Sequence, residues 1–236
     1  MTDHSEQPVA LVTGGGSGVG ASCAKHLAKS GYRIGVVGRN PDRLDETLGS
    51  IEADCHSIIA DLSAPHQCDR IIAETIEAFG RVDVLVNNAG FAAQMAIEDT
   101  TEELMRTALD TNLLGPMCLI RSLWGHFLQR GDGCIVNISS LASSDPFPGF
   151  LAYAASKSGL DSLTRSILAE RPNDSIRAFT INLAAVETAM LRSMFDHEVV
   201  PPEACLHPDE VADFVVQCVR GDHDDRQGES IVLARS

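Results

Sequence analysis

The sequence has few basic and few aromatic residues for its length of 236. Lysine and arginine total 18 against 33 aspartates and glutamates, which gives a formal net charge of −15 at pH 7. Nucleic-acid binding needs clustered positive charge, so the composition argues against it, and any anionic ligand must be held by local features of the fold. Aromatic residues make up 5% and apolar residues 44%. This predicts a core of small aliphatic side chains, as buried parallel strands require.

Spacings typical of metal or disulfide sites are also missing. The seven cysteines are odd in number and widely separated, with no C-x-x-C pair, and the eight histidines include no H-x-x-x-H pair. These patterns favour reduced thiols in a cytoplasmic protein over a disulfide framework, and they predict no metal site.

Long apolar stretches are absent as well. No run approaches the roughly 20 residues that a membrane-spanning helix needs. The N-terminus "MTDHSEQP" lacks the apolar region of a secretion signal. We therefore expect a soluble, cytoplasmic protein with a flexible tail at residues 1–7 and no membrane partner.

Short apolar runs alternate with helical patterns along the whole chain. Repeated β-α units imply a parallel sheet with right-handed crossovers and helices on both faces. We predict a single domain, residues 1–236, with a three-layer, doubly wound α/β Rossmann fold and a seven-stranded, mainly parallel sheet. The expected strands are 9–14, 33–38, 56–61, 82–90, 133–140, 176–184 and 229–234, and the expected helices are 18–30, from about 42, 67–79, 102–128, 152–170 and 209–219.

The stretch "TGGGSGVG", Thr13 to Gly20, follows the first expected strand and opens the first expected helix. Glycines allow backbone conformations that other residues avoid, and they let a pyrophosphate approach the free N–H groups at the helix N-terminus. The position therefore favours dinucleotide binding over a turn that is merely tight. It also reconciles phosphate binding with the acidic composition.

The second expected strand ends "VVGRN", and its last residues bear on cofactor choice. Dinucleotide-binding folds commonly place an acidic residue here to hold the ribose 2′-hydroxyl, but this chain has Gly38 followed by Arg39. A guanidinium can pair with a 2′-phosphate, and no carboxylate stands there to repel one. The sequence favours NADP(H), with NAD(H) as the second choice. The alternative is that Arg39 is only solvated.

Tyr153 and Lys157 lie four residues apart in an expected helix and so share a face. A nearby ammonium group stabilises a phenolate and lowers the tyrosine pKa, so the pair could exchange a proton with an alcohol or carbonyl oxygen. Ser140 ends "CIVNISS" and carries a hydroxyl able to bond the same oxygen. Spacing alone leaves an alternative open, in which Tyr153 packs, Lys157 is solvated and Ser140 is one loop serine among several.

Together these motifs resemble the short-chain dehydrogenase/reductase family over nearly the whole chain. They comprise the T-G-x-x-x-G-x-G turn (Thr13, Gly14, Gly18, Gly20), Asp61 after the third strand, "NNAG" at 87–90, Asn112, Ser140, and Y-x-x-x-K at Tyr153 and Lys157. The resemblance implies reversible hydride transfer between a nicotinamide cofactor and a small-molecule carbonyl or alcohol.

The same resemblance implies a role for each matching position. Tyr153 would donate the proton in reduction and Ser140 would polarise the carbonyl. Lys157 would bind the nicotinamide ribose and lower the tyrosine pKa, and Asn112 would hold a water in a proton relay. The expected cofactor contacts are Thr13, Gly14, Gly16, Ser17, Gly18, Val19, Gly20, Arg39, Asp61, Leu62, Asn88, Ala89, Gly90, Tyr153, Lys157, Val186 and Thr188, with Asp61 at the adenine and Thr188 at the carboxamide.

Two departures from the family pattern bear on the site. "INLAAVETAM" has Leu183 and Ala184 where the family usually has Pro-Gly, so we expect a different backbone beside the nicotinamide. The segment 190–207 is shorter than the substrate lid of many members, and the usual glycine-rich C-terminal tail does not follow "SIVLARS". Both features suggest a more open substrate site.

We therefore expect an NADPH-dependent carbonyl reductase for a small or medium ketone, aldehyde or oxoacyl compound. A homodimer or homotetramer through the long helices 102–128 and 152–170 is also expected. The alternative from another class is an NADP(H)-binding sensor with little turnover, and a sugar epimerase or dehydratase would need a longer chain. The pocket should be partly apolar, from Pro146, Phe147, Pro148, Phe150, Met190 and Met194.

Overall fold

A computed structural model describes residues 7–235, and a seven-stranded sheet forms its centre. The strand order is β3-β2-β1-β4-β5-β6-β7, and every pairing is parallel. The predicted fold class and strand number are confirmed, with a sheet that is wholly rather than mainly parallel. The strands are β1 (Val9–Thr13), β2 (Arg33–Gly38), β3 (Cys55–Ile59), β4 (Val84–Asn87), β5 (Gly133–Ser140), β6 (Ile176–Leu183) and β7 (Ser230–Leu233).

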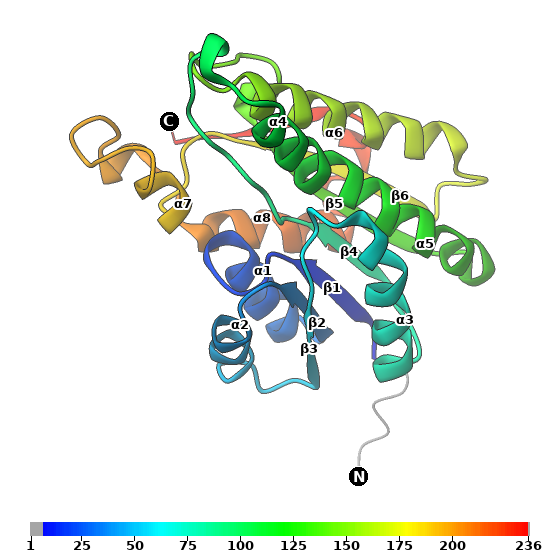
Figure 1. The fold of residues 1–236 in the computed structure, drawn as a ribbon. Coiled ribbons are helices and arrows are strands. Elements are labelled where there is room, and N and C mark those ends of the chain that lie inside the picture. The colour runs from blue at the N-terminus through cyan, green and yellow to red at the C-terminus, as the bar shows by residue number, and fades with distance from the viewer. Residues whose placement is uncertain (1–6, 236) are drawn as a thin grey trace.

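Helices cover both faces of the sheet (Figure 1). On one face α1 (Gly18–Lys29), α2 (Pro41–Leu48) and α8 (Pro208–Arg220) pack together. The other face carries α3 (Cys68–Phe79), α4 (Glu102–Leu109), α5 (Gly115–Arg130) and α6 (Leu151–Glu170). The short helix α7 (Ala189–Arg192) projects from the end of the sheet where the parallel strands finish (Figure 1). In open parallel sheets this end lines the ligand crevice.

The central strands explain why the chain adopts these layers. All five residues of β1 are buried, and their side chains alternate between the two faces as strand geometry requires. Ala10 and Val12 join the core beneath α1 and α8, while Leu11 joins the core beneath α3 and α5. A strand buried on both faces appears in the sequence as a continuous apolar run, which is why "VALVT" could be predicted to form a strand.

The long helix predicted over residues 102–128 is interrupted, so this prediction is wrong in part. Five residues, Asp110–Leu114, form a π-helical turn between α4 and α5, closed by a hydrogen bond from the Gly115 N–H to the Asp110 carbonyl. Pro116 explains the break, because it has no N–H to donate to the carbonyl of Asn112 four residues earlier. The turn places Asn112, which is fully buried, at the bend.

Helix ends follow local chemistry. Gly31 has the left-handed φ of 93° that suits a residue just past α1. The helix α4 is capped by the Thr101 side chain, which accepts from the Leu104 N–H. At α8, His207 caps the helix and Pro208 lies in its first turn, a position that suits proline.

The short segment predicted at 190–207 follows β6 and holds α7 with one further turn, Pro202–Ala204. A bridge between Val186 and Leu206 ties its two ends together. The predicted flexible tail, residues 1–7, lies outside the described residues except for Gln7.

Candidate active site

One cavity of about 1060 Å³ opens at the carboxyl ends of the strands. It runs between the glycine-rich turn, the segment after β4, the end of β5, α6 and α7. Sixteen of the residues predicted from the sequence line it: Gly14, Gly16, Ser17, Gly18, Val19, Arg39, Asp61, Leu62, Asn88, Ala89, Gly90, Ser140, Tyr153, Lys157, Val186 and Thr188.

Three predicted site residues, Thr13, Gly20 and Asn112, lie behind the cavity wall and support it. The Thr13 hydroxyl accepts hydrogen bonds from the N–H groups of Asn88 (3.0 Å) and Ala89 (3.1 Å). The Asn88 side chain returns a bond to the Thr13 carbonyl at 2.9 Å. This exchange joins the end of β1 to the segment after β4, so Thr13 shapes the cofactor crevice without facing it.

The glycine-rich turn is packed so closely that side chains would not fit. A Cβ on Gly20 would lie 2.2 Å from the Gly14 carbonyl oxygen, and one on Gly14, whose φ is 66°, would lie 2.9 Å from the Ala89 Cα. Ser17, the residue just before α1, makes no side-chain cap bond. The N–H groups of the first turn of α1 therefore face the cavity without a side-chain cap, which is the arrangement that receives an anionic phosphate.

Two arginines lie at the end of the cavity beyond β2. Arg39 is largely exposed, and its Nη1 lies 3.9 Å from Asp61 Oδ2. Arg43, in the first turn of α2, also lines the cavity and packs near Gly16. Within residues 7–235, its guanidinium has no hydrogen-bond or ion-pair partner. Arg43 is not among the residues predicted from the sequence; its spacing of four residues from Arg39 was the available signal.

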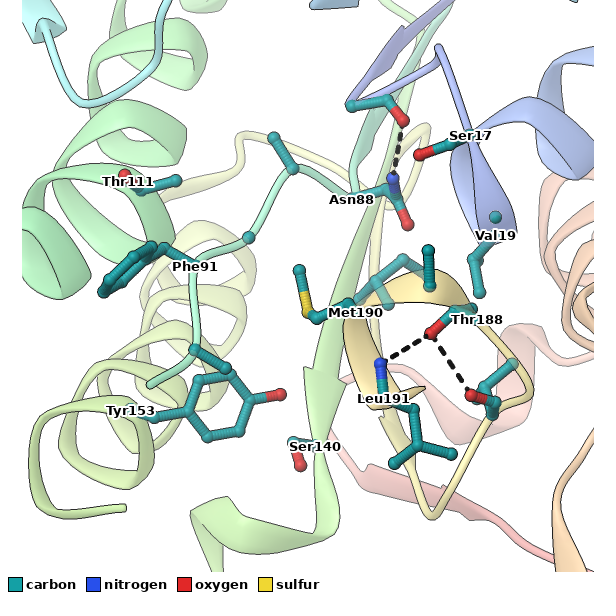
Figure 2. Close-up of a pocket in the computed structure, with 18 of the residues that line it drawn as sticks. Ser17, Val19, Asn88, Phe91, Thr111, Ser140, Tyr153, Thr188, Met190 and Leu191 are labelled. Carbon is teal, nitrogen blue, oxygen red and sulfur yellow. Dashed lines mark hydrogen bonds between the residues drawn. The ribbon is translucent and has the colours of Figure 1, made fainter. Parts of the chain in front are cut away.

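At the other end Tyr153, Ser140 and Lys157 come together. Tyr153 reaches from α6, and its hydroxyl is directed into the cavity on the side where Ser140 ends β5 (Figure 2). Burial raises the pKa of Tyr153, and a hydrogen bond with the Ser140 side chain opposes that rise. The tyrosine is therefore held in its protonated form near neutral pH, as a proton donor must be.

Lys157 is buried against the same strand. Its Nζ donates a hydrogen bond to the Ile138 carbonyl at 2.7 Å and lies 5.8 Å from the centre of the Tyr153 ring. Burial lowers the pKa of Lys157 to about 8, and the negative charge of Asp161 opposes this shift. In the structure the contribution that lowers the tyrosine pKa comes from Ser140, so the predicted tuning by Lys157 stays a prediction.

Asn112 fixes the segment after β4 from behind. Its Oδ1 accepts from the Phe91 N–H at 2.7 Å, and its Nδ2 donates to the Phe91 carbonyl at 2.8 Å and to Ser156 at 2.9 Å. The side chain thus joins the π-helical turn to the cavity wall and to α6. The predicted water relay is not tested by this geometry.

The cavity beyond Tyr153 is apolar and aromatic. Phe150 stacks on Phe195 with ring centres 6.0 Å apart and meets the Tyr153 ring edge-on at 6.0 Å. Of the apolar residues expected here, Phe147, Pro148, Phe150, Met190 and Met194 line the cavity and Pro146 does not. Several other lining residues were not predicted, because no local motif marks them: Phe91, Gln94, Thr107, Thr111, Leu191, Phe195 and Val200.

Comparisons with known proteins agree with this geometry. The sequence model described as short chain dehydrogenase matches residues 8–199. The chain belongs to the short-chain dehydrogenase/reductase family. The granaticin polyketide synthase putative ketoacyl reductase 2 of Streptomyces violaceoruber is 32% identical over 230 residues, covering 93% of this chain and 92% of that protein.

Solved structures of other short-chain dehydrogenases/reductases are similar throughout. The 3-ketoacyl-(acyl-carrier-protein) reductase of Brucella melitensis, complexed with NADH, has a TM-score of 0.90 at 28% identity and covers 96% of both chains. A variant of the actinorhodin polyketide ketoreductase, solved with NADPH, has a TM-score of 0.89 at 29% identity, covering 98% of this chain and 97% of that one. The protein is thus an NAD(P)-dependent oxidoreductase that acts on CH–OH groups.

The departure from the family's Pro-Gly motif lies in the cavity wall. Leu183 ends β6 and pairs with Ser140, while the Ala184 N–H donates to the Leu233 carbonyl at 3.0 Å. The Leu-Ala pair therefore continues the strand pairing toward β7, and both residues still line the cavity. Thr188 follows, caps α7 through the Leu191 N–H, and lies against Gly18 (Figure 2).

The described part of the chain, residues 7–235, includes every cysteine of the sequence. All seven cysteines are free thiols there, and five of them are buried. Within the same range, no group of three His, Cys, Asp or Glu side chains is placed to hold a metal ion. None of the described helices is both long and apolar enough to span a bilayer.

Proposed function

We propose that the protein is an NADP(H)-dependent carbonyl reductase with Tyr153 as its acid/base. One observation carries the proposal: a single cavity joins Tyr153 and Ser140 at one end to Arg39 and Arg43 at the other. The glycine-rich turn lies between these ends. No observation favours the alternative of a cofactor sensor without turnover, because the proton donor and its partners face the same cavity as the cofactor crevice.

The residues of the crevice fit a nicotinamide dinucleotide. Gly14, Gly16 and Gly18 line the cavity beside the start of α1 with backbone atoms alone, so a pyrophosphate can approach closely there. Pyrophosphate would bind the N–H groups at Ser17–Val19, Asp61 would hold the adenine, and Lys157 would bond the nicotinamide ribose. Thr188 would contact the carboxamide. The bound cofactor supplies the hydride.

Proton transfer falls to Tyr153. Its hydroxyl donates a proton to the substrate oxygen in reduction, while the Ser140 hydroxyl donates a hydrogen bond that holds and polarises the carbonyl. The raised pKa of Tyr153 keeps the proton available at neutral pH. Lys157 and Asn112 lie on the side of Tyr153 away from the substrate. We propose that protons pass from there to solvent through a relay in which Asn112 holds a water.

The adenosine end supports NADP(H) over NAD(H). Gly38 offers no carboxylate to bond a 2′-hydroxyl or repel a 2′-phosphate, while Arg39 and Arg43 present two guanidinium groups to the same part of the cavity. The weak 3.9 Å contact of Arg39 with Asp61 leaves donors free for a phosphate. We therefore propose NADP(H) as the preferred cofactor and NAD(H) as the second choice.

The substrate end supports an uncharged, partly apolar carbonyl compound. The charged residues that line the cavity are Arg39, Arg43, Asp61 and Lys157, the first three at the adenosine end. Around Tyr153 the wall consists of aromatic rings, methionines and a few neutral polar groups. Lys157 is the charged lining residue at this end, and it bonds the Ile138 carbonyl and is assigned to the ribose. A carboxylate or phosphate on the substrate would therefore lose its hydration there without a dedicated ionic partner.

An exposed apolar face supports self-association. Leu109, Leu114, Met117, Leu128 and Leu151 are each at least 41% exposed and lie on α4, the π-helical turn, α5 and α6. Monomeric proteins seldom leave several large apolar side chains exposed along neighbouring helices. We propose that this face joins two copies of the chain, in a dimer or as half of a tetramer.

The test of the function combines binding with turnover. NADPH and NADH are titrated by fluorescence, and NADPH oxidation is followed with a panel of uncharged ketones and matched keto acids of equal size. We expect tighter NADPH binding and turnover restricted to the uncharged compounds. NADPH binding without any carbonyl turnover would favour the sensor, and failure to bind either cofactor would refute the proposal.

A further inference from the structure

The feature that the proposed reaction leaves unexplained is Asp161, a buried carboxylate on α6. It lies one helical turn after Lys157, is 7% exposed, and does not line the cavity. Removing a carboxylate from water is costly unless its oxygens are well bonded. We therefore expect hydrogen-bond donors around both oxygens of Asp161.

The carboxylate accepts four hydrogen bonds, as many as its two oxygens readily take. Oδ1 accepts from Ser139 at 2.5 Å. Oδ2 accepts from Ser143 at 2.7 Å, from Asn182 at 2.9 Å and from Ser230 at 3.1 Å. The donors come from β5, the turn after β5, β6 and β7. One side chain of α6 thus joins the ends of three strands.

Two of these donors flank the catalytic serine. Ser139 precedes Ser140 in β5, and Ser143 ends the turn that Ser140 caps by accepting from the Ala142 N–H at 3.2 Å. Fixing both neighbours fixes the direction of the Ser140 hydroxyl. Because Asp161 and Tyr153 share α6, the same contact sets the serine relative to the tyrosine.

A third donor precedes the Leu183–Ala184 pair. Asn182 pairs with Ser139 across the β5–β6 ladder, and its Nδ2 donates to both Asp161 and Ser143 (2.7 Å). A Pro-Gly pair would restrict this backbone through the proline ring. In this chain the restriction comes instead from side-chain bonds that hold the residue before the pair.

Asp161 also balances a buried charge. Among the described residues, the titratable groups facing Lys157 are Tyr153 and Asp161, both on α6. The strand β5 presents the Ile138 carbonyl, and the segment after β4 presents the backbone at Gly90. Within residues 7–235, Asp161 is the negative charge that raises the lysine pKa against the effect of burial.

We propose that Asp161 is a positioning residue of the reaction: its carboxylate holds the Ser140 turn and the Leu183–Ala184 backbone against α6 and balances the charge of Lys157. The kinetic part of this inference rests on the proposed reductase function. The charge part does not, and it is tested without turnover.

The charge part is tested by an NMR titration of cofactor-free protein with isotope-labelled lysine. The chain has three lysines, Lys25, Lys29 and Lys157, so Lys157→Met assigns the signal. In Asp161→Asn we expect the midpoint of Lys157 to fall by about one pH unit, because the opposing negative charge is removed. An unchanged midpoint would overturn this part.

The positioning part is tested by kinetics against a matched control. Thr164 lies on α6, is fully buried, and accepts a hydrogen bond from Asn137 at 2.9 Å, away from the cavity. We expect Asp161→Asn to lower kcat by about tenfold to a hundredfold, as small misplacements of reacting groups do. Thr164→Val should lower thermal stability and leave kcat per folded molecule unchanged. Equal losses of kcat in both variants would contradict positioning.

A second variant keeps the inference testable if Asp161→Asn does not fold. Ser143→Ala removes one donor to Asp161 without altering any charge. It should lower kcat while the Lys157 titration stays as in the wild type, and unchanged kcat would overturn positioning. If the wild type turns over no carbonyl, the proposed function fails, and the lysine titration still decides the role of Asp161.

Discussion

The Nζ atom of Lys157 donates a hydrogen bond to the carbonyl oxygen of Ile138 at 2.7 Å, two residues before Ser140 on the same strand. A lysine that is 4% exposed is therefore fixed to the strand that carries Ser140, the serine that we propose polarises the carbonyl. This contact leaves two of the three lysine donors for other partners. Because this bond fixes the position of the Nζ atom, a change of pH alters the charge of Lys157 and not its location.

The first prediction concerns that charge and cofactor affinity. Below its pKa of about 8 Lys157 is protonated and, in the proposed cofactor complex, would donate charge-assisted hydrogen bonds to the ribose; above that pKa the amine is neutral. NADPH affinity should therefore be constant to about pH 7 and weaken by about fivefold toward pH 9.5, because a charge-assisted bond exceeds a neutral one by about 1 kcal/mol. Fluorescence titrations across this range measure it.

Lys157→Met is the control for that prediction. It keeps most of the length of the side chain and removes the ionisable group, so its weaker NADPH affinity should not vary with pH. A decline of equal size in both proteins would assign the pH dependence to another group.

The second prediction concerns the proton donor. Tyr153→Phe removes one oxygen and should lower kcat by about 10² to 10⁴-fold, the range for general acid catalysis. NADPH affinity should stay within about twofold, because a hydroxyl lost from the cavity wall removes at most one weak bond to the cofactor. Tyr32, the other of the two tyrosines, provides the matched control, and Tyr32→Phe should retain full turnover. Comparable activity in the two variants would reject Tyr153 as the acid.

The third prediction concerns the two arginines at the adenosine end. Arg39→Ala and Arg43→Ala should each weaken NADPH binding by about tenfold, consistent with loss of one charge-assisted bond of about 1.5 kcal/mol. NADH lacks the 2′-phosphate, so its affinity should change by less than about twofold and acts as the internal control. Equal effects on both cofactors would mean that the arginines hold the adenosine rather than the phosphate.

Much of the fold could be predicted from the sequence because parallel strands buried on both faces must be continuous apolar runs. The glycine-rich turn could be predicted for a similar reason. Where a Cβ would lie 2.2 Å from a carbonyl oxygen, as at Gly20, only glycine is compatible with the packing. In both cases one local constraint determines the residue type. The order of the strands and the position of the crevice follow from these elements.

The rest depends on contacts between distant segments. The break at Asp110–Leu114 lies inside a helical pattern, and Pro116 alone does not say whether a helix bends or ends there. Phe195 enters the cavity because the segment after α7 packs on Phe150, a contact without a sequence signal. The partners of Asp161 come from four segments that only the sheet brings together. Periodicity reports local structure and cannot locate such contacts.

The last prediction concerns the exposed apolar face. Met117 and Leu128 lie on α5 and are 44% and 45% exposed, so a charge placed at either would be solvated in a monomer and buried in a dimer through this face. Met117→Glu and Leu128→Glu should therefore convert the protein to a monomer in analytical ultracentrifugation, with far-ultraviolet circular dichroism unchanged. Ile59→Glu is the matched control, because Ile59 is 56% exposed on the edge strand β3, away from α5. If the α5 variants keep the mass of the wild-type oligomer, the copies associate through another surface.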